Sequence, residues 1–327
     1  MQKKIFERLV SRKMENTRLD MYLLKGGIGL SRSRTEKLIK EGKVLVNGKK
    51  SKPGYKVKEG DHIYVEFEVY EPIKLIAQDL PVPIVYEDDD VIVINKPKGL
   101  VVHPAKGNAT GTLVNFLLAR YKKLPTNEQK QRPGIVHRLD KDTTGLMVVA
   151  KSERALFSLG RQMEEKTAKR TYIAFVWGRV PLDEGTIDAP IGRHPVDRTK
   201  MAVTPFNSRA AITHFKVLKR YGELATKLKL NLHTGRTHQI RVHMEYFGYP
   251  VIGDETYSGR DPRKILRIVP SSFKAHVAEI LKIMDRQALH AASLTFFHPG
   301  LGRRVTFEAE LPDDMQELED YLKKISG

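Results

Sequence analysis

The chain has 327 residues, enough for a full hydrophobic core and for about two domains, and its 57 Lys and Arg against 39 Asp and Glu give a formal net charge of +18. Because the basic residues are spread along the chain and no run of about 18 apolar residues could span a bilayer, the expected partner is nucleic acid and not a membrane. The absence of cysteine excludes disulfides and thiolate chemistry, and the first residues lack the apolar core of a secretion signal, so we expect a soluble cytoplasmic protein.

Residues 17–67 are expected to form a small basic module with two helices and a hairpin-like pair of strands. Apolar residues at helical spacing begin at Leu19, the pair Gly26-Gly27 ends this first helix, and Ser31 can cap a second one. The apolar strings 44–46 and 62–67 suit strands, and the pair Asn47-Gly48 suits a tight turn.

Five basic residues gather on or beside these two helices: Arg18, Arg32, Arg34, Lys37 and Lys40. A charged helix face is usually just solvated, but in a chain of this net charge a surface that follows RNA phosphates is an equally good interpretation. The strings Arg18-Leu19-Asp20, Ser31-Arg32-Ser33 and Val44-x-Val46-Asn47-Gly48 resemble the S4 domain. The resemblance implies an RNA-binding α/β domain at residues 1–70, in which Arg18, Arg32 and Arg34 contact RNA.

Residues 71–83 are predicted to be a linker, because Pro72, Pro81 and Pro83 interrupt a stretch without a sustained apolar period. A second, larger domain is then expected at residues 84–327. The adjacent carboxylates 87–90 stand between two strand-like strings, which favours a turn over a metal site. The string Asn95-Lys96-Pro97-x-Gly99-Leu100 is a rigid basic turn, which we expect to pack beneath the loop described next.

The stretch 134–150 places a cluster of reactive side chains between two apolar strings. Residues 135–136 are predicted to end a buried strand and residues 146–150 to form another, so the residues between them lie in a loop at a sheet edge. The loop contains one imidazole, one guanidinium and two carboxylates, from His137, Arg138, Asp140 and Asp142. Taken alone, such a cluster is most often a solvated turn, so its meaning depends on the neighbouring sequence.

The remaining elements predict an α+β domain with a largely antiparallel sheet. Helical spacing occurs at residues 112–120 and 153–166, strand alternation at 171–177 includes Tyr172, and residues 178–232 suit short antiparallel strands. A final pair of strands and a short helix end the chain. Thr237 can cap a helix that Gly248 stops. Within it, His238 and His243 are five residues apart, so they do not stack as a helical zinc pair.

The string His137-Arg138-Leu139-Asp140-Lys141-Asp142-Thr143-Thr144-Gly145-Leu146 resembles the signature of the RluA/RluD family of pseudouridine synthases. Further matches follow the expected order at residues 95–104, at Lys169-x-x-Tyr172-x-Ala174, and at residues 232–243 and 250–257. A long string with ordered matches on both sides is far more specific than a lone short pattern. The resemblance implies a catalytic domain with a largely antiparallel mixed sheet flanked by helices, and it implies conversion of uridine to pseudouridine in RNA.

This reaction moves uracil from an N1 to a C5 glycosidic bond and needs no oxidant, metal or nucleotide cofactor. It needs a carboxylate that stays ionised in a confined pocket, as nucleophile at C1′ or as base on the sugar, and therefore a fixed cation beside it. The resemblance assigns Asp140 as this carboxylate and Arg241 as its ion-pair partner, while Tyr172 packs on the uracil and helps to remove the C5 proton. Asp142 is the nearest rival carboxylate, and a covalent route and an elimination route both stay open.

A uridine in folded RNA reaches such a pocket only after it leaves its stack, which costs a few kcal/mol. Arg138 is expected to stabilise the vacated position or a phosphate. His137 is expected to belong to the substrate-binding residues and to orient the loop, with support of the loop by hydrogen bonding as the alternative. The basic loop 193–200 is a further candidate RNA contact.

The sequence allows three functions to be compared. An S4-like module joined to this catalytic domain is closest to the RluD branch, which implies large-subunit ribosomal RNA as substrate and leaves transfer RNA as the alternative. A non-catalytic RNA-binding ribosome-assembly factor is opposed by the joint presence of Asp140, Tyr172 and Arg241. A nuclease or other phosphoryl-transfer enzyme is disfavoured because the sequence lacks a phosphate loop and a convincing two-metal carboxylate set. No cofactor, membrane or obligate protein partner is inferred, which is compatible with a monomer.

Overall fold

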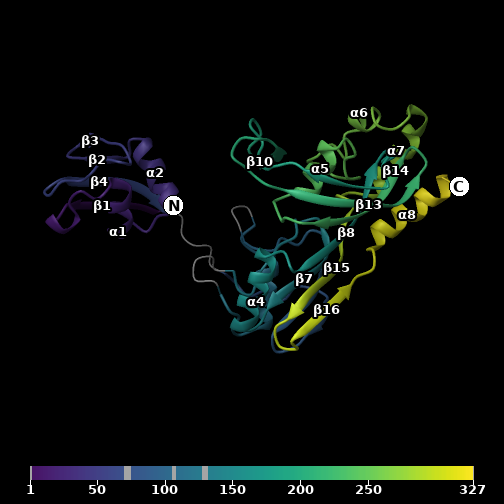
Figure 1. Ribbon diagram of the computed structural model, residues 1–327, viewed down its shortest axis with the longest axis horizontal. Helices are drawn as coiled ribbons and strands as arrows, with labels where there is room; N and C mark the ends of the chain where they lie inside the picture. Colours follow the sequence, from purple (N-terminus) through teal and green to yellow (C-terminus); the bar gives the residue numbers. More distant parts are fainter. Residues whose placement is uncertain (1, 70–74, 105–107, 127–131, 327) are drawn as a thin grey trace. The chain divides into compact units, whose positions relative to one another are not determined.

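Figure 1 shows the computed structural model, which describes residues 2–69, 75–104, 108–126 and 132–326. The chain divides into two compact units, Met1–Ile73 and Lys74–Gly327. Over the described residues, no helix combines the length and the apolar character that crossing a membrane requires.

The first unit packs two helices on an antiparallel sheet. Its elements are β1 (Gln2–Leu9), the 3-10 turn η1 (Arg12–Met14), α1 (Leu19–Lys25), α2 (Arg32–Lys40), β2 (Val44–Val46), β3 (Lys49–Lys50) and β4 (His62–Val69), with the sheet order β1-β4-β2-β3. Both predicted helices are confirmed, and the Ser31 side chain caps α2. The Asn47-Gly48 turn is confirmed as well, with the left-handed φ values of 50° and 76° that a tight hairpin turn requires.

Strand β1 has no counterpart among the predicted elements. It lies at the sheet edge and pairs with β4 along its whole length, from Gln2↔Val69 to Leu9↔His62. Phe6 is buried, whereas Ile5 is 61% exposed. Charged residues break the apolar pattern of this strand, so its conformation depends on pairing with a distant segment and not on local alternation.

The second unit contains helices on both sides of a large sheet. Its helices are α3 (Leu113–Arg120), α4 (Glu153–Glu164), α5 (Gln239–Tyr246), α6 (Pro262–Ile265), α7 (Lys274–Ile283) and α8 (Asp313–Ser326), with a 3-10 turn η2 (Ser271–Phe273). Its strands are β5 (Ile84–Glu87), β6 (Val91–Lys96), β7 (Thr144–Ala150), β8 (Lys169–Trp177), β9 (Glu184–Asp188), β10 (Ile191–Arg193), β11 (Met201–Val203), β12 (Ser208–Arg209), β13 (Ile212–Tyr221), β14 (Ala225–Leu232), β15 (Leu289–His298) and β16 (Arg303–Glu308).

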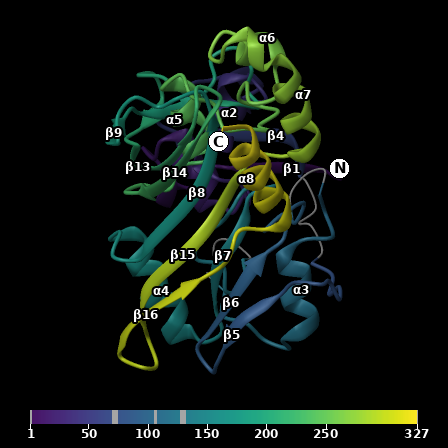
Figure 2. The ribbon, with the colours of Figure 1, turned by 90° about the vertical axis from the view of Figure 1, so that its right-hand side faces the viewer.

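The main sheet of this unit is nine-stranded over the described residues, in the order β5-β6-β7-β15-β8-β14-β13-β9, with β16 beside β15. Figure 2 shows β5, β6, β7, β15 and β16 side by side. The pair β7–β15 is parallel and the other pairs are antiparallel, which confirms the predicted largely antiparallel mixed sheet. Strand β6 alternates between two cores, because Val91 and Val93 pack with α4, and Ile92 and Ile94 pack with α3.

The sheet narrows where β7 meets β15, and only His290↔Thr144 and Ala291↔Gly145 pair there. Gly145 has a φ of 113°, and a Cβ at this position would lie 2.4 Å from the carbonyl oxygen of Ala291. Only glycine permits this close approach of the two backbones. The loop that ends at Thr143 therefore leads into the sheet where the strands β5, β6 and β7 join the remaining strands through the short β7–β15 pairing.

Two local predictions are wrong. Residues 135–136 do not end a strand, because Ile135 forms an isolated bridge to Val149 and nothing longer. Thr237 does not cap α5, because the N-cap is His238 in a left-handed conformation, and its side chain makes no capping hydrogen bond.

The segment 75–83, which falls in the predicted linker, contacts the second unit. The Asn115 side-chain amide of α3 donates to the Ile76 carbonyl at 2.6 Å, and the Gln78 N–H donates to the Asn115 carbonyl at 3.0 Å. Leu80 and Val82 pack against the main core. Residues 71–74 of the predicted linker lie outside the described residues.

Candidate active site

The buried side chain of Lys96 forms a hydrogen bond to the backbone of the loop that carries Asp140. Its Nζ donates to the carbonyl oxygens of Pro97, Leu100 and Lys141 at 2.8, 2.9 and 2.8 Å. Burial lowers the pKa of Lys96 to about 7, yet three carbonyl acceptors match the ammonium form, which alone offers three N–H donors. This turn packs beneath the loop, as its sequence predicts.

A second buried cation holds the same loop from the C-terminal part of the chain. Arg286 donates to the Asp142 carbonyl at 3.0 Å, and its other nitrogens pair with the Asp314 carboxylate at 2.7 Å each. The neighbouring Gln287 donates to the Thr143 hydroxyl at 3.2 Å. Two segments distant in sequence thus fix the three residues that directly follow Asp140.

The side chain of Asp140 faces a buried guanidinium. Arg241 Nη1 lies 3.1 Å from Asp140 Oδ2, and the rest of this guanidinium pairs with Asp254 at 2.6 and 2.9 Å. Burial opposes the charge of Arg241, but the hydrogen bonds and charge of Asp254, and then of Asp140, outweigh it and raise the pKa of Arg241. Arg241 is therefore a permanent cation beside a carboxylate whose side chain is still 17% exposed.

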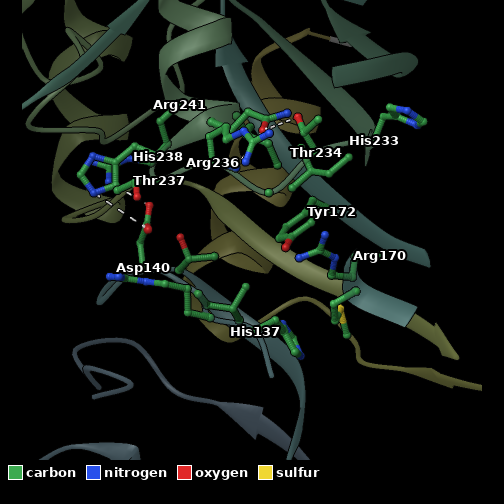
Figure 3. Close-up of a pocket in the computed structure, with 18 of the residues that line it drawn as sticks. His137, Asp140, Arg170, Tyr172, His233, Thr234, Arg236, Thr237, His238 and Arg241 are labelled. Atoms are coloured by element: carbon green, nitrogen blue, oxygen red, sulfur yellow. Dashed lines mark hydrogen bonds and ion pairs between the residues drawn. The ribbon is translucent and has the colours of Figure 1, made fainter. Parts of the chain in front are cut away.

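Asp140, Arg241 and Tyr172 line one cavity of about 470 Å³ (Figure 3). Its walls come from the loop before β7, the C-terminal end of α4, the start of β8, and the β14–α5 connection. Tyr172 is buried, and this burial raises the pKa of its hydroxyl, so the ring presents a neutral phenol. The rival Asp142 is not among the described residues that line this cavity.

Comparison with known proteins identifies the family to which the chain belongs. Residues 90–246 match the family model described as RNA pseudouridylate synthase, and residues 17–63 match the S4 domain. The chain is 44% identical to the "Uncharacterized RNA pseudouridine synthase YlyB" of Bacillus subtilis, over 96% of this chain and 97% of that one. It belongs to the family of RNA pseudouridine synthases.

Two further likenesses agree with this family. The synthase is 46% identical to the "Ribosomal large subunit pseudouridine synthase D" of Vibrio cholerae, over 94% of its own chain and 91% of the other. Its fold resembles the solved structure titled "Human RNA Pseudouridylate Synthase Domain Containing 4", with a TM-score of 0.54 and 25% identity over 74% of this chain and 93% of that one.

The two remaining loop residues singled out from the sequence also line the cavity of the synthase. His137 Nε2 accepts from the Val148 N–H at 3.1 Å, and burial lowers the pKa of His137 to about 3, so this ring is neutral. Of its two sequence-based roles, the structure favours support of the loop by hydrogen bonding. Arg138 is exposed at the cavity rim, where a phosphate could reach it.

Three residues of the synthase site were not assigned from the sequence. Asp254 is fully buried and fixes Arg241, Tyr257 packs its ring under the same guanidinium, and His238 Nε2 lies 3.9 Å from Asp140 Oδ1. A buried arginine needs an acidic partner, and Asp254 lies in the family-like string at residues 250–257. That string is the signal from which the partner of Arg241 could have been predicted.

The cations predicted from the S4 resemblance lie on the first unit. Arg18 and Arg32 both pair with the fully buried Asp20, at 3.0 and 3.4 Å, and they stay 51% and 59% exposed. Arg34 lies in the first turn of α2 and is half-buried. These guanidiniums therefore present charge to solvent while a buried carboxylate anchors two of them.

Proposed function

We propose that this synthase isomerises uridines of large-subunit ribosomal RNA, with Asp140 as its catalytic carboxylate. The observation that carries the proposal is the Asp140–Arg241 pair, which lines the same cavity as Tyr172. The relatives named for the ribosomal large subunit align over 94% or more of this chain and favour that RNA as the substrate. Transfer RNA is the alternative substrate.

In this mechanism Asp140 acts at the ribose of a uridine that has left its stack. The carboxylate attacks C1′ or removes a proton from the sugar, and Arg241 compensates its negative charge inside the cavity. Tyr172 packs on the uracil ring. Because burial raises the pKa of Tyr172, stacking by the neutral phenol is better supported than removal of the C5 proton by a phenolate.

The RNA contacts come from cations other than Arg241, which pairs with Asp140. Arg138 at the cavity rim would hold the vacated position or a phosphate, and Arg18, Arg32 and Arg34 would hold the RNA backbone on the S4-like unit. An enzyme with this substrate works where ribosomes are assembled, so a cytoplasmic location belongs to the proposal. A monomer without a cofactor is part of the same prediction.

The test incubates the purified protein with unmodified large-subunit ribosomal RNA and, separately, with transfer RNA, and then maps pseudouridine in each. Product in the ribosomal RNA alone is expected. Product in transfer RNA alone would replace the substrate assignment. Binding without any product would favour the non-catalytic assembly factor, and cleavage without isomerisation would favour a nuclease.

A further inference from the structure

His238 has an unusual backbone for a helix N-cap. Its φ of 57° and ψ of 21° are left-handed values, which cost a residue with a Cβ roughly 1–2 kcal/mol. Its side chain makes no capping hydrogen bond, so helix capping does not compensate for this conformation. The conformation instead directs the imidazole into the cavity, toward Asp140 (Figure 3).

The hydrogen bonds of the Tyr257 hydroxyl favour one tautomer of His238. The Met201 N–H donates to the Tyr257 hydroxyl oxygen at 3.0 Å, and this hydroxyl lies 2.8 Å from His238 Nδ1. The tyrosine hydroxyl can donate its own proton to Nδ1, which makes Nδ1 an acceptor. Burial lowers the pKa of His238, so the ring is neutral, and its proton is then on Nε2.

The Nε2–H of His238 and the carboxylate of Asp140 form a donor and an acceptor at one side of the cavity. Arg241 takes Asp140 Oδ2, whereas Oδ1 faces His238 Nε2 at 3.9 Å. This separation is too long for a direct hydrogen bond. One oxygen atom that accepts from Nε2 and donates to Oδ1, at about 2.8 Å from each, fits between them.

We propose that His238 and Asp140 together bind the 2′-hydroxyl of the uridine in the cavity, which makes His238 a determinant of ribose specificity. This inference rests on the proposed function, which places Asp140 at C1′. The 2′-hydroxyl is on the neighbouring carbon and is both a donor and an acceptor. The 3′ and 5′ oxygens of a nucleotide within the chain are esterified and cannot donate.

The test compares two synthetic RNAs that contain the uridine mapped in ribosomal RNA, one with uridine and one with 2′-deoxyuridine at that position. Single-turnover rates at subsaturating enzyme are measured for the wild type and for His238→Asn. Asparagine tolerates the left-handed backbone but is too short to reach Asp140. We expect 2′-deoxyuridine or His238→Asn alone to slow the reaction by about 10- to 100-fold, and the two together to slow it no further.

Two variants serve as controls. His233→Asn removes another imidazole from the cavity lining, one whose ring pairs with that of His214, so its effect and that of 2′-deoxyuridine should multiply. Tyr257→Phe removes the hydroxyl that fixes the tautomer, and it should show a smaller loss that overlaps with the loss caused by 2′-deoxyuridine.

The outcomes separate this inference from the function on which it rests. No product from the uridine RNA with wild-type enzyme would refute the proposed function. Product with multiplying losses for His238→Asn and 2′-deoxyuridine would refute the role of His238 and leave the function intact. A ¹⁵N spectrum of the free wild-type protein provides a check without RNA: a proton on Nδ1 of His238 would overturn the tautomer and with it the proposal.

Discussion

Each unit contains an ion pair between an arginine and an aspartate, but the more buried side chain is the aspartate in the first unit and the arginine in the second. In the first unit, the carboxylate of Asp20 is fully buried and the guanidinium of Arg18 is 51% exposed. In the second unit, the guanidinium of Arg241 is 8% exposed and pairs with the more accessible Asp140. In each pair the more buried side chain anchors the more accessible one, and the more accessible one can meet a ligand.

This difference matches two kinds of chemistry. An exposed cation anchored by a buried acid suits phosphates, which need positive charge and tolerate many geometries. An accessible carboxylate anchored by a buried cation suits a reaction at one carbon, which needs one oxygen in one place. The hydrogen bond from Arg18 holds the pKa of Asp20 below its usual value, while Asp254 and Asp140 raise the pKa of Arg241.

The largest effect is expected when the accessible carboxylate is neutralised. Asp140→Asn should lower the single-turnover rate of pseudouridine formation by about 10⁴-fold or more, while RNA affinity is largely kept, because the amide cannot act at the sugar. Asp142→Asn is the matched control, because it changes the rival carboxylate of the same loop. Arg286 contacts the backbone carbonyl of Asp142, which this substitution leaves in place. A dead Asp142 variant beside an active Asp140 variant would exchange the two assignments.

The next effect concerns stability and compares the buried cation with the exposed one. Arg241→Met leaves Asp254 fully buried without its guanidinium, which should cost about 3–5 kcal/mol of unfolding free energy. Arg18→Met should cost less, because Asp20 keeps Arg32 and the Met21 N–H. Urea unfolding followed by the fluorescence of Trp177, the single tryptophan, reports on the second unit, and circular dichroism reports on both. Equal losses would contradict the contrast between the units.

Local sequence patterns predicted the elements that are stabilised by interactions between residues close in sequence. Helical periodicity and a cap gave α2, and the Asn47-Gly48 pair gave a hairpin turn. The resemblance supplied Asp140, Tyr172 and Arg241, and the structure brings all three to one cavity. Such features depend on residues within a few positions of one another or on a family string.

The missed features depend on contacts between distant segments. Arg286 reaches the Asp142 carbonyl across 144 positions, and β1 exists because β4 pairs with it. Thr237 has the residue type of a helix cap, but the left-handed backbone at His238 moves the cap by one residue. No local pattern encodes these contacts, because each is chosen by packing of the whole unit.

Acid should unfold the second unit before the first. Burial lowers the pKa of His137 to about 3 and of His290 to about 4, so these rings take up a proton only on unfolding. Between pH 6.5 and about 4 the unfolded state then binds more protons, and the unfolding free energy falls by about 1.4 kcal/mol per pH unit for each ring. Asp20, whose pKa is lowered, contributes stability that is present above pH 3.8 and is lost only at lower pH.

The measurement for this prediction is thermal unfolding at a series of pH values. The midpoint from Trp177 fluorescence should fall from pH 6.5 downward, and the circular dichroism should lose only the part that comes from the second unit until the pH drops below about 4. Loss of both signals together would mean that protonation of the two histidines does not decide the order of unfolding.

The smallest effect is expected on the exposed side of the comparison. Changing Arg18, Arg32 and Arg34 to Gln should weaken RNA binding and reduce the slope of log affinity against log salt by about 2, since each lost phosphate contact removes about 0.7 for single-stranded RNA. The same number of exposed cations changed at Lys4, Arg12 and Lys13 provides a matched loss of charge away from α1 and α2. If both triple variants shift the slope equally, net charge alone attracts the RNA, and the guanidiniums around Asp20 form no specific phosphate surface. If only the first triple does, a buried acid that orients exposed cations is what distinguishes a binding surface from a merely charged one.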